Sequence, residues 1–207
     1  MHTDSLVKLD PWFSIWVQPR KTVRFLLNQR KELAGLVIVC LAGIAQVLDN
    51  ASNSAPEEFR GLRETISLAL LAGPFLGLIG LYIGSWLTAF TGRWIGGLGS
   101  KADLRVALAW SNLPIALSLI AWSLAIYVFG ESLFINMEES IEQNPFLAMN
   151  LMMFGLAQAV LGVWSLIIMI KGVAEVQEFS AWKGLGNIVL ASLIILVPLI
   201  AIGLLVV

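Results

Sequence analysis

The sequence predicts an all-α integral membrane protein with five transmembrane helices and a short N-terminal interfacial helical arm. The chain has 207 residues, of which 58% are hydrophobic and only 13% are charged, whereas soluble domains carry roughly 25% charged residues. Its apolar residues also gather in long stretches, and about 20 such residues let a helix cross the roughly 30 Å hydrocarbon core. We therefore expect two parts, an arm over residues 1–31 and a five-helix membrane domain over residues 32–207.

Five apolar stretches are expected to form the membrane spans. They run over residues 33–48, 66–90, 113–129, 146–170 and 188–207. The first and third are short for a span. We expect the first to extend back through Lys31 and Glu32, whose side chains can reach the headgroups, and the third to begin earlier, near Asp103.

The basic residues predict the orientation, because Lys and Arg are retained on the cytoplasmic side of a membrane. Eleven of the 13 lie in segments that alternating spans place on one side: Lys8, Arg20, Lys21, Arg24, Arg30, Lys31, Arg93, Lys101, Arg105, Lys171 and Lys183. The opposite side holds Arg60 and Arg63 and most of the acidic loop residues, among them Glu131, Glu138, Glu139 and Glu142. The sequence thus predicts a cytoplasmic N-terminus and a C-terminus outside.

The arm has an amphipathic pattern. Apolar residues share a helical face in each half, with bases next to them: Trp12, Ile15, Trp16, Val23, Leu26 and Leu27, beside Lys21, Arg24 and Arg30. This pattern favours a segment in the headgroup layer near anionic lipid, and the alternative is packing on the protein's own cytoplasmic loops. Pro11 and Pro19 are expected to divide the arm into two short helices.

Small residues recur on one helical stripe of the second span, at Gly73, Gly77, Gly80 and Gly84. Because small residues let helix backbones approach closely in lipid, this stripe should pack against a neighbouring helix. A homodimer contact and a substrate groove are the alternatives. The fourth span carries a similar stripe that includes Gly155 and Gly162, and we expect the two stripes to meet.

Candidate residues for catalysis or for cofactor and metal binding are scarce. The apolar cores of the five spans contain no ionisable residue, which weakens an ion-coupled transporter, and the one histidine, His2, lies at the terminus. Residues 97–102 match a loose dinucleotide-binding pattern, but no strand precedes them. We expect a turn there instead, with Ser100 capping a helix and Asp103 three residues later. We therefore expect no enzyme, no cofactor, no metal and no nucleic-acid partner.

Three stretches of the chain resemble the Yip family, which is named for interaction with Ypt/Rab GTPases. The first combines Gly-Gly-Leu-Gly-Ser at 96–100, Asp-Leu-Arg at 103–105 and Ala-Leu-Ala-Trp-Ser-Asn-Leu-Pro at 107–114. The second combines Val-Trp-Ser at 163–165 with Lys-Gly-Val-Ala-Glu-Val-Gln-Glu-Phe-Ser-Ala-Trp at 171–182, and the third is the arm at 16–24, where Pro19 precedes Thr-Val-Arg at 22–24.

This resemblance implies five spans, a cytoplasmic N-terminus and a C-terminus on the far side. Eukaryotic relatives act in vesicle traffic by binding prenylated Rab proteins through a long N-terminal region. The arm here covers only residues 1–31. The simple loops of this chain are similar to those of bacterial members, whose hosts lack Rab proteins. The resemblance therefore implies a bacterial cytoplasmic (inner) membrane, and the Rab function does not carry over.

The leading hypothesis is a non-enzymatic inner-membrane protein that organises membrane or recruits a partner through its cytoplasmic face. The residues expected there are Trp12, Trp16, Arg24, Arg93, Lys101, Arg105, Glu175 and Trp182. Anionic lipid headgroups, an unidentified protein and a second copy of the chain are the expected partners. The alternative is a small-solute or lipid transporter or channel that acts as an oligomer, with a groove lined by Asn112, Gln158 and Asn187.

Overall fold

The computed structural model describes residues 9–29, 32–54, 61–134 and 145–206, and within these ranges the chain is helical and has no strand. The helices are α1 (Pro11–Val17), α2 (Pro19–Gln29), α3 (Glu32–Ser52), α4 (Leu62–Trp94), α5 (Lys101–Ser111), α6 (Leu113–Phe129), the 3-10 helix η2 (Gly130–Leu133), α8 (Pro145–Val176) and α9 (Ala181–Val206). Several residues used above lie outside the described ranges: His2, Lys8, Arg30, Lys31, Arg60, Glu138, Glu139 and Glu142.

Five helical stretches are long and apolar enough to cross a membrane, which confirms the predicted class. They are Glu32–Ser52, Leu62–Trp94, Lys101–Leu133, Ala148–Val176 and Ala181–Leu204. All five run past the predicted limits into polar sequence at one end or both, because backbone hydrogen bonding continues to a cap whereas hydropathy detects only the apolar part. The cap of α5 is the expected one, since the Ser100 hydroxyl accepts a hydrogen bond from the Asp103 N–H at 3.1 Å.

The arm is divided into two helices at Pro19, as predicted, and the first of them begins with a side-chain cap. The Asp10 side chain accepts a hydrogen bond from the Trp12 N–H at 3.0 Å, and Pro11 occupies the first helical turn, where no N–H partner is needed. One face of the arm is buried, with Ile15, Val23 and Leu26 fully inside. This face packs on α5 and α8.

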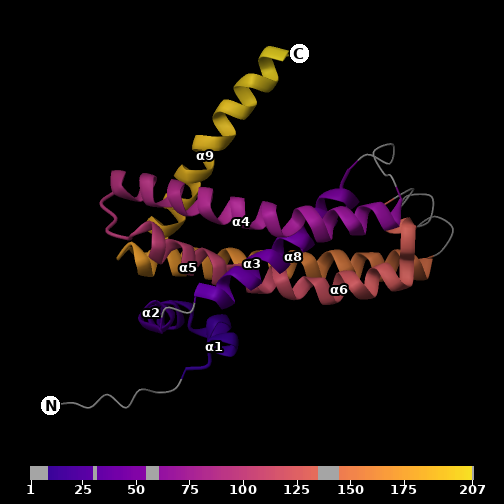
Figure 1. Cartoon of the computed structure of the whole chain (residues 1–207), viewed down its shortest axis with the longest axis horizontal. Helices are drawn as coiled ribbons and strands as arrows, with labels where there is room; N and C mark the ends of the chain where they lie inside the picture. Colours follow the sequence, from indigo (N-terminus) through magenta and orange to yellow (C-terminus); the bar gives the residue numbers. More distant parts are fainter. Residues whose placement is uncertain (1–8, 30–31, 55–60, 135–144, 207) are drawn as a thin grey trace.

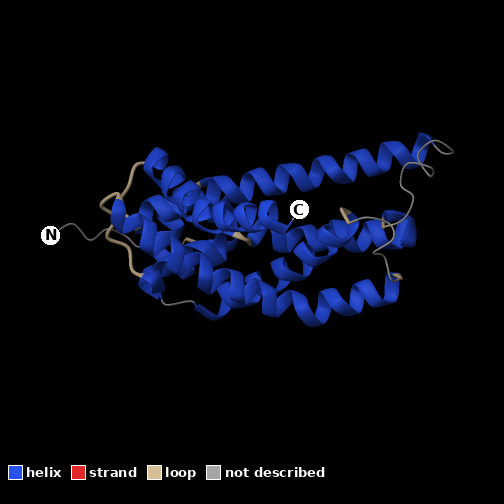
Figure 2. Cartoon of the chain, turned by 90° about the horizontal axis from the view of Figure 1, so that it is seen from above, coloured by secondary structure: helices blue, strands red, loops and turns tan. Residues whose placement is uncertain are grey.

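The long helices form an elongated bundle in which α4, α6 and α8 follow the long axis and α3 crosses obliquely among them (Figure 1). We call the "arm end" the end of the bundle where residues 95–100 join α4 to α5 and residues 177–180 join α8 to α9. Figure 2 shows the same all-helical bundle from above. Helix α9 leaves the bundle steeply (Figure 1), and its residues 195–204 are all exposed.

Glycines set the separation of α3 and α4, the most extensively packed pair of helices. A Cβ at Gly43 would overlap the carbonyl oxygen of Gly73, and a Cβ at Gly73 would lie 2.7 Å from the Ile44 Cα. A Cβ at Gly77 would lie 2.5 Å from the Val39 carbonyl oxygen. Close backbone approach of this kind favours helix association in lipid, where no hydrophobic drive acts between helices.

The other half of the glycine stripe lies away from this crossing. A Cβ at Gly80 would meet nothing within 4 Å, and one at Gly84 would meet only the Leu108 side chain at 3.9 Å. The prediction that the two glycine stripes meet is wrong. A Cβ at Gly155 or Gly162 would also meet nothing within 4 Å, and the partner of the second span is α3, which supplies its own glycine at the crossing.

Replacing Gly43 by alanine should destabilise the protein by about 1–3 kcal/mol, because the added methyl group forces α3 and α4 apart. Gly80→Ala is the matched control, since both changes raise helix propensity but only the first adds an atom to the crossing. The measurement is the thermal unfolding temperature in detergent. Equal unfolding temperatures for the two variants would show that the crossing does not limit stability.

Candidate functional site

The buried side chain of Gln177 joins two of the stretches singled out in the sequence. Gln177 follows the last residue of α8 and is 1% exposed. Its Oε1 accepts a hydrogen bond from the Gly99 N–H at 2.9 Å, and its Nε2 donates to the Thr88 carbonyl of α4 at 3.1 Å. The amide thus links the end of α8 to α4 and to the turn at residues 95–100.

Glycines at the end of α4 and in the turn that follows leave the space that this amide occupies. A Cβ at Gly92 or at Gly97 would overlap the Gln177 amide, and one at Gly99 would lie 2.8 Å from Val176 Cγ1. A larger residue at any of these positions would push α8 away from the turn. The glycine-rich sequence therefore provides close packing of two helix ends, and no strand accompanies it in the described chain.

Helices α4 and α8 end with the same backbone geometry. In α4 the Gly97 N–H donates to the Gly92 carbonyl at 2.8 Å and the Gly96 N–H to the Arg93 carbonyl at 3.2 Å, with Gly96 at φ +88°. This is a Schellman motif, which satisfies carbonyls left free at a helix end.

In α8 the Phe179 N–H donates to the Ala174 carbonyl at 2.7 Å and the Glu178 N–H to the Glu175 carbonyl at 3.3 Å. The left-handed position there is held by Glu178, at φ +58°. An L side chain in this region costs about 1–2 kcal/mol. The chain thus keeps a strained residue where glycine is usual.

A second buried polar contact joins α4 to α9. The Thr91 hydroxyl lies 2.7 Å from Oδ1 of Asn187, which is fully buried. Asn187 is therefore part of the packing at the arm end. The other two predicted groove residues lie elsewhere: Asn112 donates to the Leu108 carbonyl at 2.8 Å, and Gln158 is half-buried on α8. None of the three residues lines the pocket between α3, α4 and α5.

Polar contacts attach the arm to this same end. Arg24 forms an ion pair with Glu175 (Nη2 to Oε1, 2.6 Å), although its side chain is 72% exposed. The Arg20 guanidinium donates to the Phe179 carbonyl at 2.8 Å. Because an exposed ion pair contributes at most about 1 kcal/mol, the buried apolar face of the arm must supply most of the attachment.

The predicted aromatic residues of the arm take part in packing. The Trp12 ring lies 5.2 Å from that of Trp110, and the Trp16 indole N–H donates to the Trp12 carbonyl at 3.0 Å. The Trp16 carbonyl in turn accepts from the Trp164 indole at 3.3 Å. These contacts place the arm against the bundle, as one of the two alternatives for it required.

Large apolar side chains and bases are exposed in segments at the arm end. Phe13, Val17 and Trp182 are 76%, 78% and 82% exposed. We call these three side chains the exposed rim. Four bases in segments at this end are exposed as well: Lys21, Arg93, Lys101 and Lys183. The predicted cytoplasmic face included Trp182 but not Phe13 or Val17, because which face of the arm is buried depends on its packing against α5 and α8.

The remaining predicted residue, Arg105, lies over the Tyr82 ring with 5.1 Å from Cζ to the ring centroid. Within the described residues no three His, Cys, Asp or Glu side chains are grouped so that they could hold a metal ion.

Comparison with protein families gives one match. The model of the Yip1 domain covers residues 13–203, which includes the arm, the glycine turn, the Gln177 segment and nearly all of α9. No curated protein and no solved structure matches the chain.

Gln177→Leu should destabilise the protein by about 1–3 kcal/mol, because it removes both hydrogen bonds and leaves the Gly99 N–H without its acceptor. Amide hydrogen exchange at Gly99 should speed up at the same time. Glu178→Gly is the control in the next position, and it should leave stability unchanged or raise it by about 1 kcal/mol. Unchanged exchange at Gly99 in the leucine variant would contradict the bridging role.

Proposed function

Because the chain belongs to the Yip1 family of membrane proteins, we propose that it is a non-enzymatic protein that organises membrane or recruits a protein or lipid partner through its arm end. Its five membrane-spanning helices make it a multi-pass membrane protein, and Yip1 proteins are not known as enzymes. The observation that carries the proposal is the exposed rim, two of whose residues lie on an arm that buried contacts attach to the bundle. Apolar side chains beside bases suit a headgroup layer or a docked partner.

The buried contacts of the arm matter because they fix the position of the two rim residues on α1, Phe13 and Val17. Arm residues with exposures near zero, such as Val23 and Leu26, anchor α2 between α5 and α8. The exposed side chains are therefore presented in one arrangement. A partner that binds them does not have to order the arm first, which saves the entropy that a disordered segment would lose on binding.

We also propose that the arm end faces the cytoplasm of a bacterial inner membrane, with the C-terminus outside. The support is the distribution of Lys and Arg, most of which lie in segments at this end. A homo-oligomer stays a prediction, and the exposed outer half of α9 is compatible with one.

Labelling of single cysteines tests the orientation. In a Cys40→Ala background, a membrane-impermeant maleimide applied to intact cells should label Ser54→Cys and spare Lys21→Cys, because the two exposed positions lie on opposite sides. Permeabilised cells should label both. Labelling of Lys21→Cys alone in intact cells would reverse the proposed topology.

The rim itself can be tested by triple alanine substitution of Phe13, Val17 and Trp182. Proteins and anionic lipids that co-purify with the full chain in polymer-extracted membrane discs are measured by mass spectrometry. The variant should lose a discrete protein or bound anionic lipid several-fold, since each exposed apolar side chain contributes about 1–3 kcal/mol on burial.

The control is the triple alanine variant of three exposed apolar residues of α6 away from the arm end: Leu124, Tyr127 and Val128. This variant should keep the wild-type set of lipids and proteins. Identical co-purification from the rim variant, the control and the wild type would remove the support for recruitment through the rim.

A further inference from the structure

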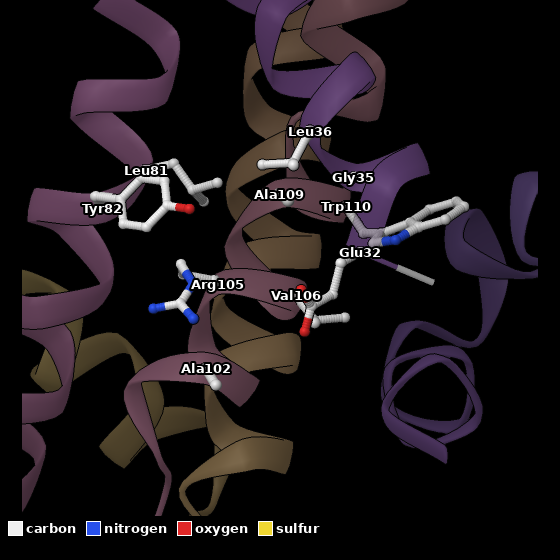
Figure 3. Close-up of a pocket in the computed structure, with 10 residues that line it drawn as sticks. All are labelled: Glu32, Gly35, Leu36, Leu81, Tyr82, Ala102, Arg105, Val106, Ala109 and Trp110. Carbon is white, nitrogen blue, oxygen red and sulfur yellow. The ribbon is translucent and has the colours of Figure 1, made fainter. Parts of the chain in front are cut away.

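A pocket with a volume of about 50 Å³ opens between the start of α3 and the facing sides of α4 and α5. Its polar lining consists of Glu32, Tyr82, Arg105 and Trp110 (Figure 3). Gly35 and Ala109 are among the small residues that leave the space open. None of these residues belongs to the exposed rim, so the pocket is separate from the surface described above.

The length of α4 indicates a depth for the pocket near the boundary between the hydrocarbon core and the headgroups. Helix α4 has 33 residues, and about 20 suffice to cross the core, so its last part must extend beyond it. Twenty residues counted from Ile66 end just past Tyr82. A row of exposed aromatic side chains follows, at Trp86, Phe90 and Trp94, with ring centroids 5.5 Å and 4.9 Å apart. Such rows mark the interface of a membrane.

The two charges in the pocket are not neutralised by each other. The Arg105 guanidinium faces the Tyr82 ring, and Glu32 lies on the other side of the cavity (Figure 3). Among the described residues neither forms an ion pair. Charged groups at the edge of the hydrocarbon are costly without a counter-charge, so the pocket offers one unpaired cation and one unpaired anion to a ligand.

The wall of the pocket also carries an unused hydrogen-bond donor. Trp110 is 1% exposed, and its indole N–H has no acceptor in the described structure. An indole nitrogen can only donate. This nitrogen is itself fully buried, so the Arg105 guanidinium is the donor that an oxygen-rich group in the pocket can reach.

We propose that the pocket binds a phosphate joined to a primary ammonium group, as in the headgroup of phosphatidylethanolamine. The Arg105 guanidinium donates hydrogen bonds to the phosphate oxygens, and Glu32 accepts hydrogen bonds from the ammonium. An anion alone would be repelled by Glu32, and a cation alone by Arg105. A trimethylammonium group has no N–H to donate, so a choline headgroup loses the charge-assisted bonds to Glu32.

The size of the pocket agrees with this ligand. A water molecule needs about 10–15 Å³ of such volume, so the cavity holds a group of a few heavy atoms and leaves the rest of a lipid outside. The inference deepens the lipid part of the proposed function and rests on it, because it requires this level of the bundle to meet headgroups.

Lipid binding to the full-length, delipidated protein in detergent tests the pocket. Native mass spectrometry compares phosphatidylethanolamine with phosphatidylcholine and phosphatidylglycerol, and soluble glycerophosphoethanolamine reveals whether a free headgroup suffices. We expect phosphatidylethanolamine to bind at least about tenfold more tightly than the other two lipids, which corresponds to about 1.4 kcal/mol. Equal affinity for all three lipids would overturn the proposal. Equally tight binding of the soluble compound would support the pocket and assign its ligand to a soluble source.

Two substitutions separate the two halves of the headgroup. Glu32→Gln should abolish the preference for ethanolamine over glycerol headgroups. Arg105→Gln should instead lower the affinity for phosphatidylethanolamine and for phosphatidylglycerol about tenfold each. Lys171→Gln, on α8 and outside both the pocket and the exposed rim, is the control for the lost charge. If Arg105→Gln and Lys171→Gln bind lipids alike, or if Glu32→Gln keeps the wild-type preference, the proposal is wrong.

The preference is a ratio measured within each variant, so a merely less stable protein does not imitate the expected change. A result that overturns lipid binding by the pocket can also be distinguished from one that overturns recruitment through the rim. The rim variant leaves Glu32 and Arg105 in place, and its headgroup preference reports on the pocket alone.

Discussion

The two hydrogen bonds of the buried Gln177 amide hold the arm end together. One amide offers a donor and an acceptor, and here both bind backbone groups of segments that lie 78 and 89 residues away in the sequence. An unpaired amide in this position would lose its hydration without compensation, so the three segments must stay in register. Gly92, Gly97 and Gly99 are small because this amide fills the space that a side chain would take.

The position of the arm follows from that junction. The Phe179 carbonyl and the Glu175 carboxylate, which receive Arg20 and Arg24, flank Gln177 in the chain. The buried face of α1 and α2 then packs on α5 and α8. An amphipathic segment has a second face, and on the arm it leaves Phe13 and Val17 exposed. Packing on the protein and contact with a membrane are therefore compatible, because they use opposite faces.

The lengths of the helices place this assembly relative to lipid. Helices α4 and α8 exceed the length that the hydrocarbon core requires, and the surplus carries the aromatic row and the buried polar contacts of Thr91, Gln177 and Asn187. The buried Gln177 amide is tolerable there because both of its polar atoms have partners, whereas the Asn187 Nδ2 has none among the described residues. The glycine crossing of α3 and α4 lies deeper, where close backbone contact replaces polar contact.

The sequence by itself determined the features that depend on local chemistry: five apolar helices, the division of the arm at Pro19 and the Ser100 cap of α5. Each of these follows from hydropathy or from hydrogen bonds within a few residues. Only the tertiary structure decided that Gly43 is the partner of Gly73, that Asn187 contacts Thr91, and that Glu32 and Arg105 share a pocket. Periodicity tells which face of a helix is apolar, but the neighbour of that face depends on how distant segments pack, and no local pattern records that choice.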